Sequence, residues 1–269
     1  MKLAADIALA QRLADAAGAA IRPHFRSGLA SERKGDATPV TPADREAEQA
    51  MRRILIAEAG RDGIIGEAGR DGIIGEEFGS DEGTSGRTWV LDPIDGTAGF
   101  LAGRPLFGTL IALLVDGFPV LGVIDQPILG ERWIGAAGRP TTLNGRTVRC
   151  RPCPALAEAT IATTGPHYFD DHDGEHFMAL AARTDHKRMV MGGDCYNYAM
   201  LATGQLDLVC EAGLNLHDWA ALVPVVEGAG GTMCDWAGEP LRRGADGHVL
   251  ALGDPARLED AIEALACGH

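Results

Sequence analysis

From Thr88 onward the sequence contains several short apolar runs, and residues that favour turns separate each run from the next. The runs are "TWVLDP", "LFGTLIALLV", "VLGVIDQPI", "ERWIGAAG" and "LNGRTV", with the turn segment "DGFP" between the second and the third. Runs of this length with turn residues between them are typical of β-strands that follow one another in a sheet. The middle of the chain is therefore predicted to form a meander of strands.

The residues before this meander have a helical pattern instead. The first 25 residues are amphipathic, because charged and amide side chains interrupt the apolar positions. No segment of the chain approaches the roughly 18 uninterrupted apolar residues of a membrane span. A second helix is predicted to begin at Pro42, because Thr41 can act as its N-cap and Asp44 can return a hydrogen bond to Thr41.

After Cys153, apolar strands such as "LDLVCEA" alternate with helical stretches such as "DWAALVPVVEGAGG". Alternation of this kind favours α/β layering in which some strands pair in parallel. We therefore expect a boundary near residues 150–160, with an N-terminal α+β subdomain over residues 1–153 and a C-terminal α/β subdomain over residues 154–269.

The charge of the chain limits its partners. It carries 24 Lys and Arg residues against 38 Asp and Glu residues, so its formal net charge at pH 7 is −14. Nucleic acids and anionic membrane surfaces would be repelled, which disfavours both as partners. An anionic substrate would need a bound cation, because a divalent metal ion inverts the sign of the field in an acidic pocket.

The cysteines and histidines do not form a recognisable zinc or redox motif. Six cysteines without a secretory signal predict reduced thiols in the cytoplasm. Cys150 and Cys153 form one C-x-x-C pair, which supplies only two of the four ligands that a structural zinc ion needs. The histidines show no H-E-x-x-H spacing, and most of them are predicted to be surface or packing residues.

A nine-residue unit, "EAGRDGIIG", occurs at residues 58–66 and again at residues 67–75. Two units of this length are too few and too short for a repeat architecture. Surface connections tolerate insertions at a small entropic cost, so one copy is interpreted as an insertion between a helix and a strand. Function would then use one copy only.

The segment "WVLDPIDGTAGF" is the strongest candidate for a functional site. A strand runs into Asp92, a proline follows, and Asp95 is followed directly by Gly96 and Thr97. Carboxylate oxygens suit hard cations such as Mg²⁺, and the Gly-Thr amides could receive phosphate oxygens. The same residues also make a good acidic turn, so this segment alone leaves both interpretations open.

Further acidic residues strengthen the metal interpretation. Glu76 and Glu77 end the apolar segment "GIIGEE", and Asp218 lies at a predicted helix start in "HDWAALVPVVEGAGG". Taken singly, Asp218 could be an N-cap and Glu76 a solvated loop charge. Taken together with Asp92 and Asp95, these acids favour a metal site.

These motifs resemble those of the magnesium-dependent, lithium-sensitive inositol monophosphatase superfamily. The segments "VTPADREAE", "GEE", "WVLDPIDGT" and "HDWAALVPVVEGAGG" appear in the expected order, and the resemblance runs nearly end to end. Two longer segments, "PLFGTLIALLVDGFPVLGVIDQPILGERWIG" and "GGDCYNYAMLATGQLDLVCEAGL", look most like the histidinol-phosphatase branch, which removes phosphate from L-histidinol phosphate in histidine biosynthesis. The resemblance implies an αβαβα sandwich of the inositol monophosphatase and fructose-1,6-bisphosphatase type, in a cytoplasmic homodimer.

The resemblance also implies roles for individual residues. Two to three Mg²⁺ ions would be held by Glu76, Asp92, the backbone carbonyl of Ile94, Asp95 and Asp218, with Asp92 bridging two of them. Asp44 and Thr97 would lie beside the attacking water, with Thr97 passing its hydroxyl proton towards Asp44. The substrate would be bound by Asp95, Gly96, Thr97, Gly193, Asp194 and Glu211. The residues alone predict a capping role for Asp44, and the two roles can coexist.

Because of the duplication, either of two glutamates could be the metal ligand. The family pattern has a glutamate at a strand end, then a second acid, then a short loop to the D-P-x-D motif. Glu76 fits this pattern, whereas Glu67 is followed by Ala68 and by a further copy of "GRDGIIG".

Substrate choice is expected to depend on acids beyond the metal ligands. L-Histidinol carries a protonated amine, so its pocket should present carboxylates such as Asp194 and Glu211. Alternatively, Asp194 could cap a helix that begins near Cys195. Other substrates of the same chemistry are inositol 1-phosphate, a sugar bisphosphate and 3'-phosphoadenosine 5'-phosphate, and a further alternative is an inert, metal-binding regulatory homologue.

Overall fold

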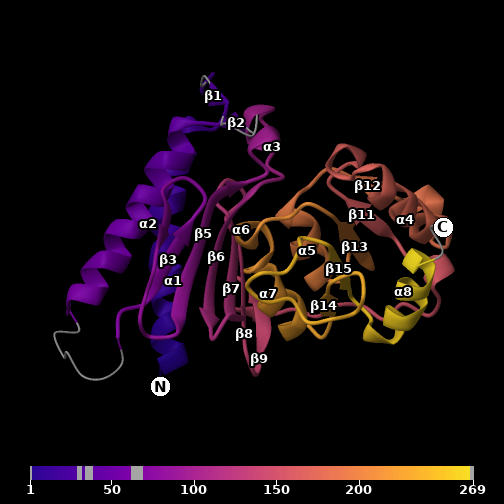
Figure 1. Cartoon of the computed structure of the whole chain (residues 1–269). Helices are drawn as coiled ribbons and strands as arrows, with labels where there is room; N and C mark the ends of the chain where they lie inside the picture. The colour runs from indigo at the N-terminus through magenta and orange to yellow at the C-terminus, as the bar shows by residue number, and fades with distance from the viewer. Residues whose placement is uncertain (1, 29–31, 34–38, 62–68, 267–269) are drawn as a thin grey trace.

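Two large β-sheets organise the protein, apart from one small two-stranded sheet in the described residues, and helices lie outside and between the large sheets (Figure 1). The computed structural model describes residues 2–28, 32–33, 39–61 and 69–266. Across these residues the layers run helix, sheet, helix, sheet, helix, which confirms the predicted αβαβα fold. Glu67 and the rest of residues 62–68 in the duplicated segment lie outside the described residues.

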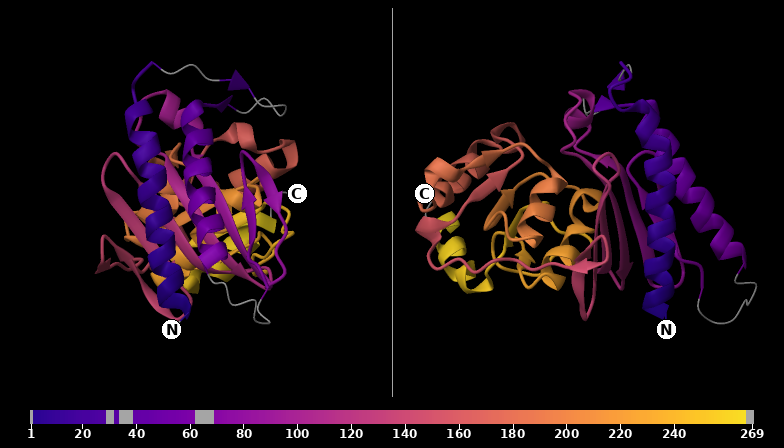
Figure 2. Two further views of the ribbon diagram at one scale, coloured as in Figure 1. Left: turned by 90° about the vertical axis from the view of Figure 1, so that its left-hand side faces the viewer. Right: turned by 180° about the vertical axis from the view of Figure 1, so that it is seen from behind.

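Helices α1 (Lys2–Ile21) and α2 (Pro42–Arg61) lie side by side on the outer face of the larger sheet (Figure 2). Small and apolar side chains are buried where they meet each other and the sheet, among them Leu13, Ala17, Ala47 and Met51. Small residues allow two helices to approach closely, and the burial of their apolar stripes stabilises the pair. Helix α2 begins at the predicted residue.

The larger sheet has the strand order β10-β9-β8-β7-β6-β5-β3-β4. Its strands are β3 (Gly72–Gly75), β4 (Gly79–Asp81), β5 (Arg87–Asp95), β6 (Gly108–Val115), β7 (Phe118–Gln126), β8 (Glu131–Ala136), β9 (Arg139–Leu143) and β10 (Arg146–Thr147). From β5 to β10 each strand pairs antiparallel with the next, as predicted for a meander. Strand β3 instead pairs in parallel with β5, so their carboxyl ends lie at the same edge of the sheet.

The smaller sheet has the order β12-β11-β13-β15-β14. Its strands are β11 (Ile161–Thr163), β12 (Val190–Met191), β13 (Leu208–Glu211), β14 (Thr232–Cys234) and β15 (Val249–Leu252). Strand β11 pairs in parallel with β12 and β13, and the other pairs are antiparallel. This mixed pairing agrees with the α/β pattern after Cys153. Helices α4 (Asp171–Ala182) and α8 (Leu258–Ala266) cover the outer face.

Helices α5 (Cys195–Ala202), α6 (Leu216–Trp219) and α7 (Leu222–Gly228) fill the space between the two sheets (Figure 1). One buried cluster joins side chains of both sheets to these helices, including Leu110 and Trp133 from the larger sheet and Val209 from the smaller. The chain passes from one sheet to the other between Thr147 and Ile161. Because both sheets share this core, a division into two subdomains at residue 153 stays a prediction.

Shorter elements complete the described part of the chain. They are β1 (Glu32–Arg33), β2 (Pro39–Val40), α3 (Thr97–Leu101) and the 3-10 helices η1 (Arg22–His24), η2 (Leu156–Glu158), η3 (Pro166–Tyr168), η4 (His186–Arg188) and η5 (Pro255–Arg257). None of the helices in the described ranges is both long enough and apolar enough to cross a membrane.

Candidate active site

Acidic side chains from distant parts of the chain meet at one edge of the larger sheet. The potential ligand atoms of Glu76, Asp92 and His217 lie within 4.8 Å of one another, and so do those of Asp92, Asp95 and Asp218. Glu76 follows β3, the two aspartates at 92 and 95 belong to β5, and Asp218 belongs to α6. The structure thus brings together the four carboxylates singled out in the sequence, and Asp92 belongs to both groups.

The parallel pairing of β3 with β5 places Glu76 beside Asp92. Gly75 is opposite Leu91, and the amide of Glu76 donates a hydrogen bond to the Leu91 carbonyl at 3.2 Å. The next residue of each strand is therefore one of the two acids. In this register the second copy of the nine-residue unit supplies the strand, and Glu76 is the glutamate at its end.

A bulge in β5 turns Asp92 and Asp95 towards the same site. Side chains three residues apart in a regular strand point to opposite faces, but the pairing of β5 with β6 shifts its register between these two residues. Pro93 has no amide to donate, and its carbonyl accepts from Thr109 Oγ1 at 2.8 Å. The amide of Ile94 donates to Asp92 Oδ1 at 3.1 Å, which orients that carboxylate.

Asp218 is oriented by the start of helix α6. Its Oδ2 accepts a hydrogen bond from the Asn215 amide at 2.6 Å, in a capping box in which Asn215 is the N-cap. The alternative in which Asp218 itself is the N-cap is therefore wrong, because the helix begins three residues earlier than that interpretation requires. The other oxygen, Oδ1, lies 3.5 Å from His217 Nε2.

Asp44 and Thr97 are hydrogen-bonded to other residues rather than to each other. Asp44 Oδ2 accepts from the Thr41 amide at 2.8 Å and from Thr41 Oγ1 at 2.6 Å, which confirms the predicted capping interaction. Asp44 Oδ1 is buried and has no hydrogen-bond partner in the structure. Thr97 Oγ1 donates to the Ile94 carbonyl at 3.0 Å. No hydrogen bond joins Thr97 to Asp44 in the described chain, so the proton relay between them stays a prediction.

In the absence of a cation, the ionised carboxylates of this site destabilise the folded protein. Burial raises the pKa of Asp92 well above its usual range, and the nearby charges of Glu76, Asp95 and Asp218 raise it further. Burial also raises the pKa of Asp95 and of Asp218. Buried like charges stay ionised only when a cation compensates them, and the oxygens of the four carboxylates suit a hard ion such as Mg²⁺, with one nitrogen, of His217, beside them. The residues therefore fit the expected metal.

Asp194 lies beside the acidic site in an unusual backbone conformation. Its φ of 46° and ψ of −134° lie in a region that non-glycine residues rarely adopt, as is typical of functional sites. Although it precedes α5, its side chain makes no capping hydrogen bond, so the predicted capping alternative is wrong. The Cys195 amide donates instead to Asp95 Oδ2 at 2.6 Å. Burial raises the pKa of Asp194 to about 6.

Glu211 ends strand β13 and is only 1% exposed. It accepts hydrogen bonds from the Thr164 amide at 2.7 Å and from the hydroxyls of Thr164 and Thr163 at 3.0 and 3.1 Å. Burial nevertheless raises the pKa of Glu211 to about 7. A cavity of about 460 Å³ connects Glu211, Asp194 and the acidic site, and Tyr168 and Leu214 also line it.

The whole chain matches a known family. The model of the inositol monophosphatase family matches residues 2–267. The protein belongs to this family. A solved structure of an inositol monophosphatase from Zymomonas mobilis is 49% identical, has a TM-score of 0.85 and covers 97% of both chains. A chloroplastic bifunctional phosphatase, IMPL2, of Arabidopsis thaliana is 44% identical over 96% of this chain and 74% of its own. A histidinol-phosphatase of Chlorobaculum parvum is 34% identical over 98% of each chain.

Glu48 supports the candidate site but was not predicted from the sequence. It lies four residues after Asp44 on α2, and its side chain is fully buried. Its carboxylate accepts from the amides of Glu77 and Phe78 at 2.7 and 3.3 Å and from Arg52 Nε at 2.7 Å. It therefore anchors the turn that follows Glu76. The helical spacing of Asp44, Glu48 and Arg52 was the available signal, because residues four apart share one helix face.

The buried acids should make the stability of the folded protein depend on pH. The folded state binds the Glu211 proton more tightly than the unfolded state, so stability falls as pH rises from about 4.5 to about 7. Glu211 alone accounts for a loss on the order of 3 kcal/mol. Thermal unfolding in EDTA should show a lower midpoint at about pH 8 than at about pH 5. Glu211→Gln should reduce this difference, and a midpoint that rises over the same interval would contradict the assignment.

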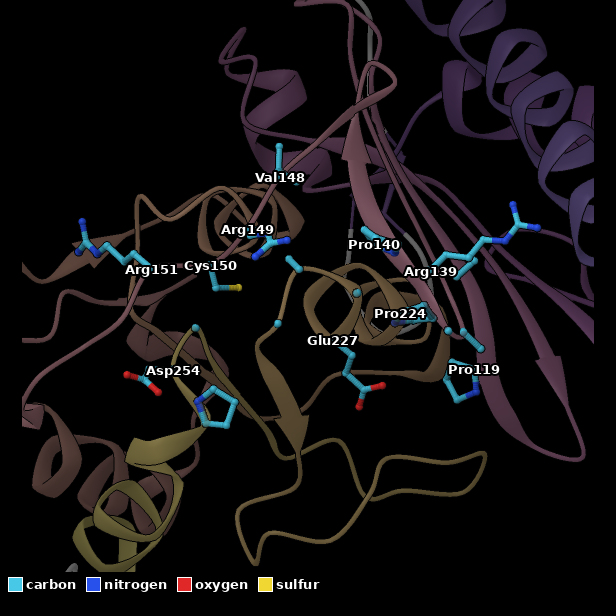
Figure 3. Close-up of a pocket in the computed structure, with 18 of the residues that line it drawn as sticks. Pro119, Arg139, Pro140, Val148, Arg149, Cys150, Arg151, Pro224, Glu227 and Asp254 are labelled. Carbon is cyan, nitrogen blue, oxygen red and sulfur yellow. The ribbon is translucent and has the colours of Figure 1, made fainter.

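A larger cavity of about 640 Å³ is separate from the acidic site and runs along residues 148–152 and the end of α7 (Figure 3). Its labelled residues include Arg139, Arg149, Cys150, Glu227 and Asp254. Burial raises the pKa of the Cys150 thiol to about 11, so the thiol stays protonated at neutral pH. Both cysteines of the C-x-x-C pair are free. These observations do not favour a redox role for the pair.

Proposed function

We propose that the protein is a Mg²⁺-dependent phosphate monoester hydrolase and that its substrate is L-histidinol phosphate, which it converts to L-histidinol and phosphate. The observation that carries the proposal is the convergence of four carboxylates beside a cavity that holds two further acids, Asp194 and Glu211. The similarity to a histidinol-phosphatase over 98% of each chain supports it.

The proposed metal ligands are the side chains of Glu76, Asp92, Asp95 and Asp218 and the backbone carbonyl of Ile94. Bound Mg²⁺, two to three ions per site, supplies activation of the attacking water and neutralisation of the phosphate charge. The ligands come from β5, from the residue after β3 and from α6, and the capping box at Asn215 and the bulge at Pro93 hold them in place. Such preorganised positioning is most of what phosphoryl transfer requires of a protein.

The backbone at Gly96 and Thr97 is proposed to bind the phosphate. Gly96 has a φ of 85°, which a residue with a side chain rarely adopts, and it precedes the first turn of α3. A Cβ at residue 96 would lie 3.0 Å from Asp194 Cγ, so a larger side chain there would crowd Asp194. The amides of residues 96 and 97 can therefore approach the phosphate oxygens closely.

Asp44 and Thr97 are proposed to handle the proton of the attacking water. The buried Oδ1 of Asp44 is available as an acceptor, because only Oδ2 is used by Thr41. A rotation of the Thr97 hydroxyl away from the Ile94 carbonyl would let it accept from the water and donate towards Asp44.

Asp194 and Glu211 are proposed to select the cationic alcohol. Both carboxylates line the cavity that contains the proposed metal site, and the neighbouring Gly193 has a φ of 125°, which residues with a side chain rarely adopt. A protonated amine placed between them would compensate their charge, and a charge-assisted hydrogen bond is stronger than a neutral one. An inositol ring offers only neutral hydroxyls to these acids.

Inositol 1-phosphate is the second candidate substrate. It is favoured by the 49% identity to an inositol monophosphatase of known structure. An inert regulatory homologue is disfavoured, because the full set of acids is present and converges. The resemblance further supports a cytoplasmic homodimer that lithium inhibits, and the net charge of −14 disfavours nucleic acids and anionic membranes as partners.

A panel of phosphorylated alcohols assayed with Mg²⁺ tests the proposal. L-Histidinol phosphate should give the highest kcat/KM, ahead of inositol 1-phosphate, a sugar bisphosphate and 3'-phosphoadenosine 5'-phosphate. A preference for inositol 1-phosphate would overturn the substrate but keep the reaction. Mg²⁺ binding without phosphate release from any member would overturn the reaction itself.

Asp194→Ala should raise the KM for L-histidinol phosphate by about 10- to 100-fold, because it removes a buried charge-assisted hydrogen bond. The KM for inositol 1-phosphate should change much less. Steady-state kinetics with both substrates measure the difference, and Asp194→Asn, which keeps the side-chain shape, serves as the matched variant. Equal effects on the two substrates would contradict the role of Asp194.

A further inference from the structure

Two histidines face each other on the outer helix α4, on the far side of the smaller sheet from the acidic site (Figure 1). His172 and His176 are four residues apart, so they occupy the same face of the helix. Their Nε2 atoms are 3.1 Å apart, and their rings meet edge to face with centroids at 4.4 Å and an interplanar angle of 83°. The proposed phosphatase reaction does not use either residue.

The contact of His176 with helix α8 determines which of its nitrogens can act as a ligand. His176 Nδ1 is hydrogen-bonded to the backbone carbonyl of Leu265. A carbonyl oxygen only accepts, so Nδ1 carries the proton of the neutral ring, and the lone pair of Nε2 is directed towards His172. A backbone carbonyl on the second ring nitrogen is the arrangement that orients histidine ligands in metal sites.

The scaffold around the pair is well anchored. Phe177 and Leu180 of α4 are buried with Leu265 of α8 in the same apolar cluster. The Asp170 carboxylate caps α4 by accepting from the Asp173 amide at 2.7 Å. Both imidazoles are therefore carried by an element whose position is fixed before any ligand binds, which lowers the entropic cost of binding.

The spacing of the two nitrogens suits one shared ion. Two imidazole nitrogens that each lie about 2.0–2.1 Å from a zinc ion are about 3.3 Å apart at a tetrahedral angle. The observed separation of 3.1 Å needs only a small adjustment. A proton on His172 Nε2 would move to Nδ1 of the same ring, so a neutral His172 binds without net loss of a proton.

We propose that His172 and His176 form a binding site for a divalent transition-metal ion such as Zn²⁺, Ni²⁺ or Cu²⁺, with water or further donors in the remaining positions. Imidazole nitrogen suits these ions, whereas Mg²⁺ prefers oxygen. The two sites therefore offer different donor atoms, with imidazole nitrogen here and mainly carboxylate oxygen at the acidic site. Because the ion binds the folded pair, it should also stabilise the protein against unfolding.

Calorimetric titration of the untagged protein with ZnCl₂, in the presence of saturating Mg²⁺ to occupy the acidic site, tests the proposal. We expect saturable binding of a single equivalent and a rise in the thermal unfolding midpoint. His172→Ala should weaken this binding by at least about tenfold and abolish the rise in the midpoint, while leaving the His176 contact with Leu265 in place.

Two controls make the result decisive. His24→Ala, which removes a histidine bonded to Glu46 at 3.0 Å far from α4, should leave Zn²⁺ binding unchanged. Asp92→Asn should also leave it unchanged, because the acidic site is separate. Equal Zn²⁺ affinity in the wild-type and His172→Ala proteins would overturn the proposal, and so would Zn²⁺ binding that Mg²⁺ displaces. Neither outcome depends on which phosphate ester the enzyme hydrolyses.

Discussion

Asp92→Asn should reduce phosphate release by about 10³-fold or more, because a neutral amide at the centre of both acidic groups cannot hold the cation that the reaction needs. Asparagine keeps the shape of the side chain but removes a charge whose ionisation is opposed by burial and by three neighbouring acids. The metal-free variant should therefore be at least as stable as the wild type at neutral pH. Phosphate release at varied Mg²⁺, together with thermal unfolding in EDTA, measures both effects.

The duplicated segment provides a matched control for this experiment. Glu76→Gln should also lose most activity, whereas Glu67→Gln changes the glutamate that follows the first unit, as Glu76 follows the second, and should remain active. Full activity of Asp92→Asn at ordinary Mg²⁺ concentrations would refute the metal site. Loss of activity in Glu67→Gln with retention in Glu76→Gln would reverse the choice between the two glutamates.

Glu48→Gln should raise the Mg²⁺ concentration needed for half-maximal activity by about 10- to 100-fold, a usual cost of losing a residue that orients a metal ligand. Glu48 is a positioning residue, because it holds the amides of Glu77 and Phe78 directly after Glu76. At saturating Mg²⁺ the kcat should recover towards the wild-type value. Initial rates over a range of Mg²⁺ concentrations measure the shift.

Glu46→Gln is the matched control on the same helix. Glu46 is two residues from Glu48, its side chain is 57% exposed, and it contacts His24 rather than the turn after β3. Its replacement should change neither Mg²⁺ dependence nor stability. Lower stability of Glu48→Gln with an unchanged Mg²⁺ dependence would mean that Glu48 only supports the fold.

Local patterns in the sequence were sufficient to predict many elements of the fold. The start of α2 follows from Thr41, Pro42 and Asp44, whose capping contacts span only three residues. The meander from β5 to β10 follows from apolar runs and turn residues, because each strand pairs with its neighbour in the chain. The site acids could be selected because strand ends and helix starts have local signatures.

Contacts between distant residues could not be predicted in this way. The amide of Cys195 is satisfied by Asp95, which lies 100 residues earlier in the chain. Local reasoning left open that Asp194 caps α5, but its side chain makes no capping hydrogen bond and lines the cavity instead. A helix terminus specifies that an amide needs an acceptor but not which part of the chain supplies it.

The duplicated unit shows most clearly how local sequence preference differs from contacts between distant residues. Gly60 and Arg61 end helix α2, whereas the same residues in the second copy, Gly69 and Arg70, precede strand β3. Identical residues have identical local preferences, so propensity cannot account for this difference. The second copy is held by long-range contacts: Asp71 accepts from Ser85, Arg87 and Trp89, and the turn after β3 is bound by Glu48.

The sequence alone determined three features: the capped start of α2, the strand meander, and a set of carboxylates suited to a hard cation. Only the tertiary structure decided that β3 pairs in parallel with β5 and that Glu76 therefore lies beside Asp92. The physical reason is that pairing between separated strands depends on side chains and hydrogen bonds from several elements at once, which no single segment contains.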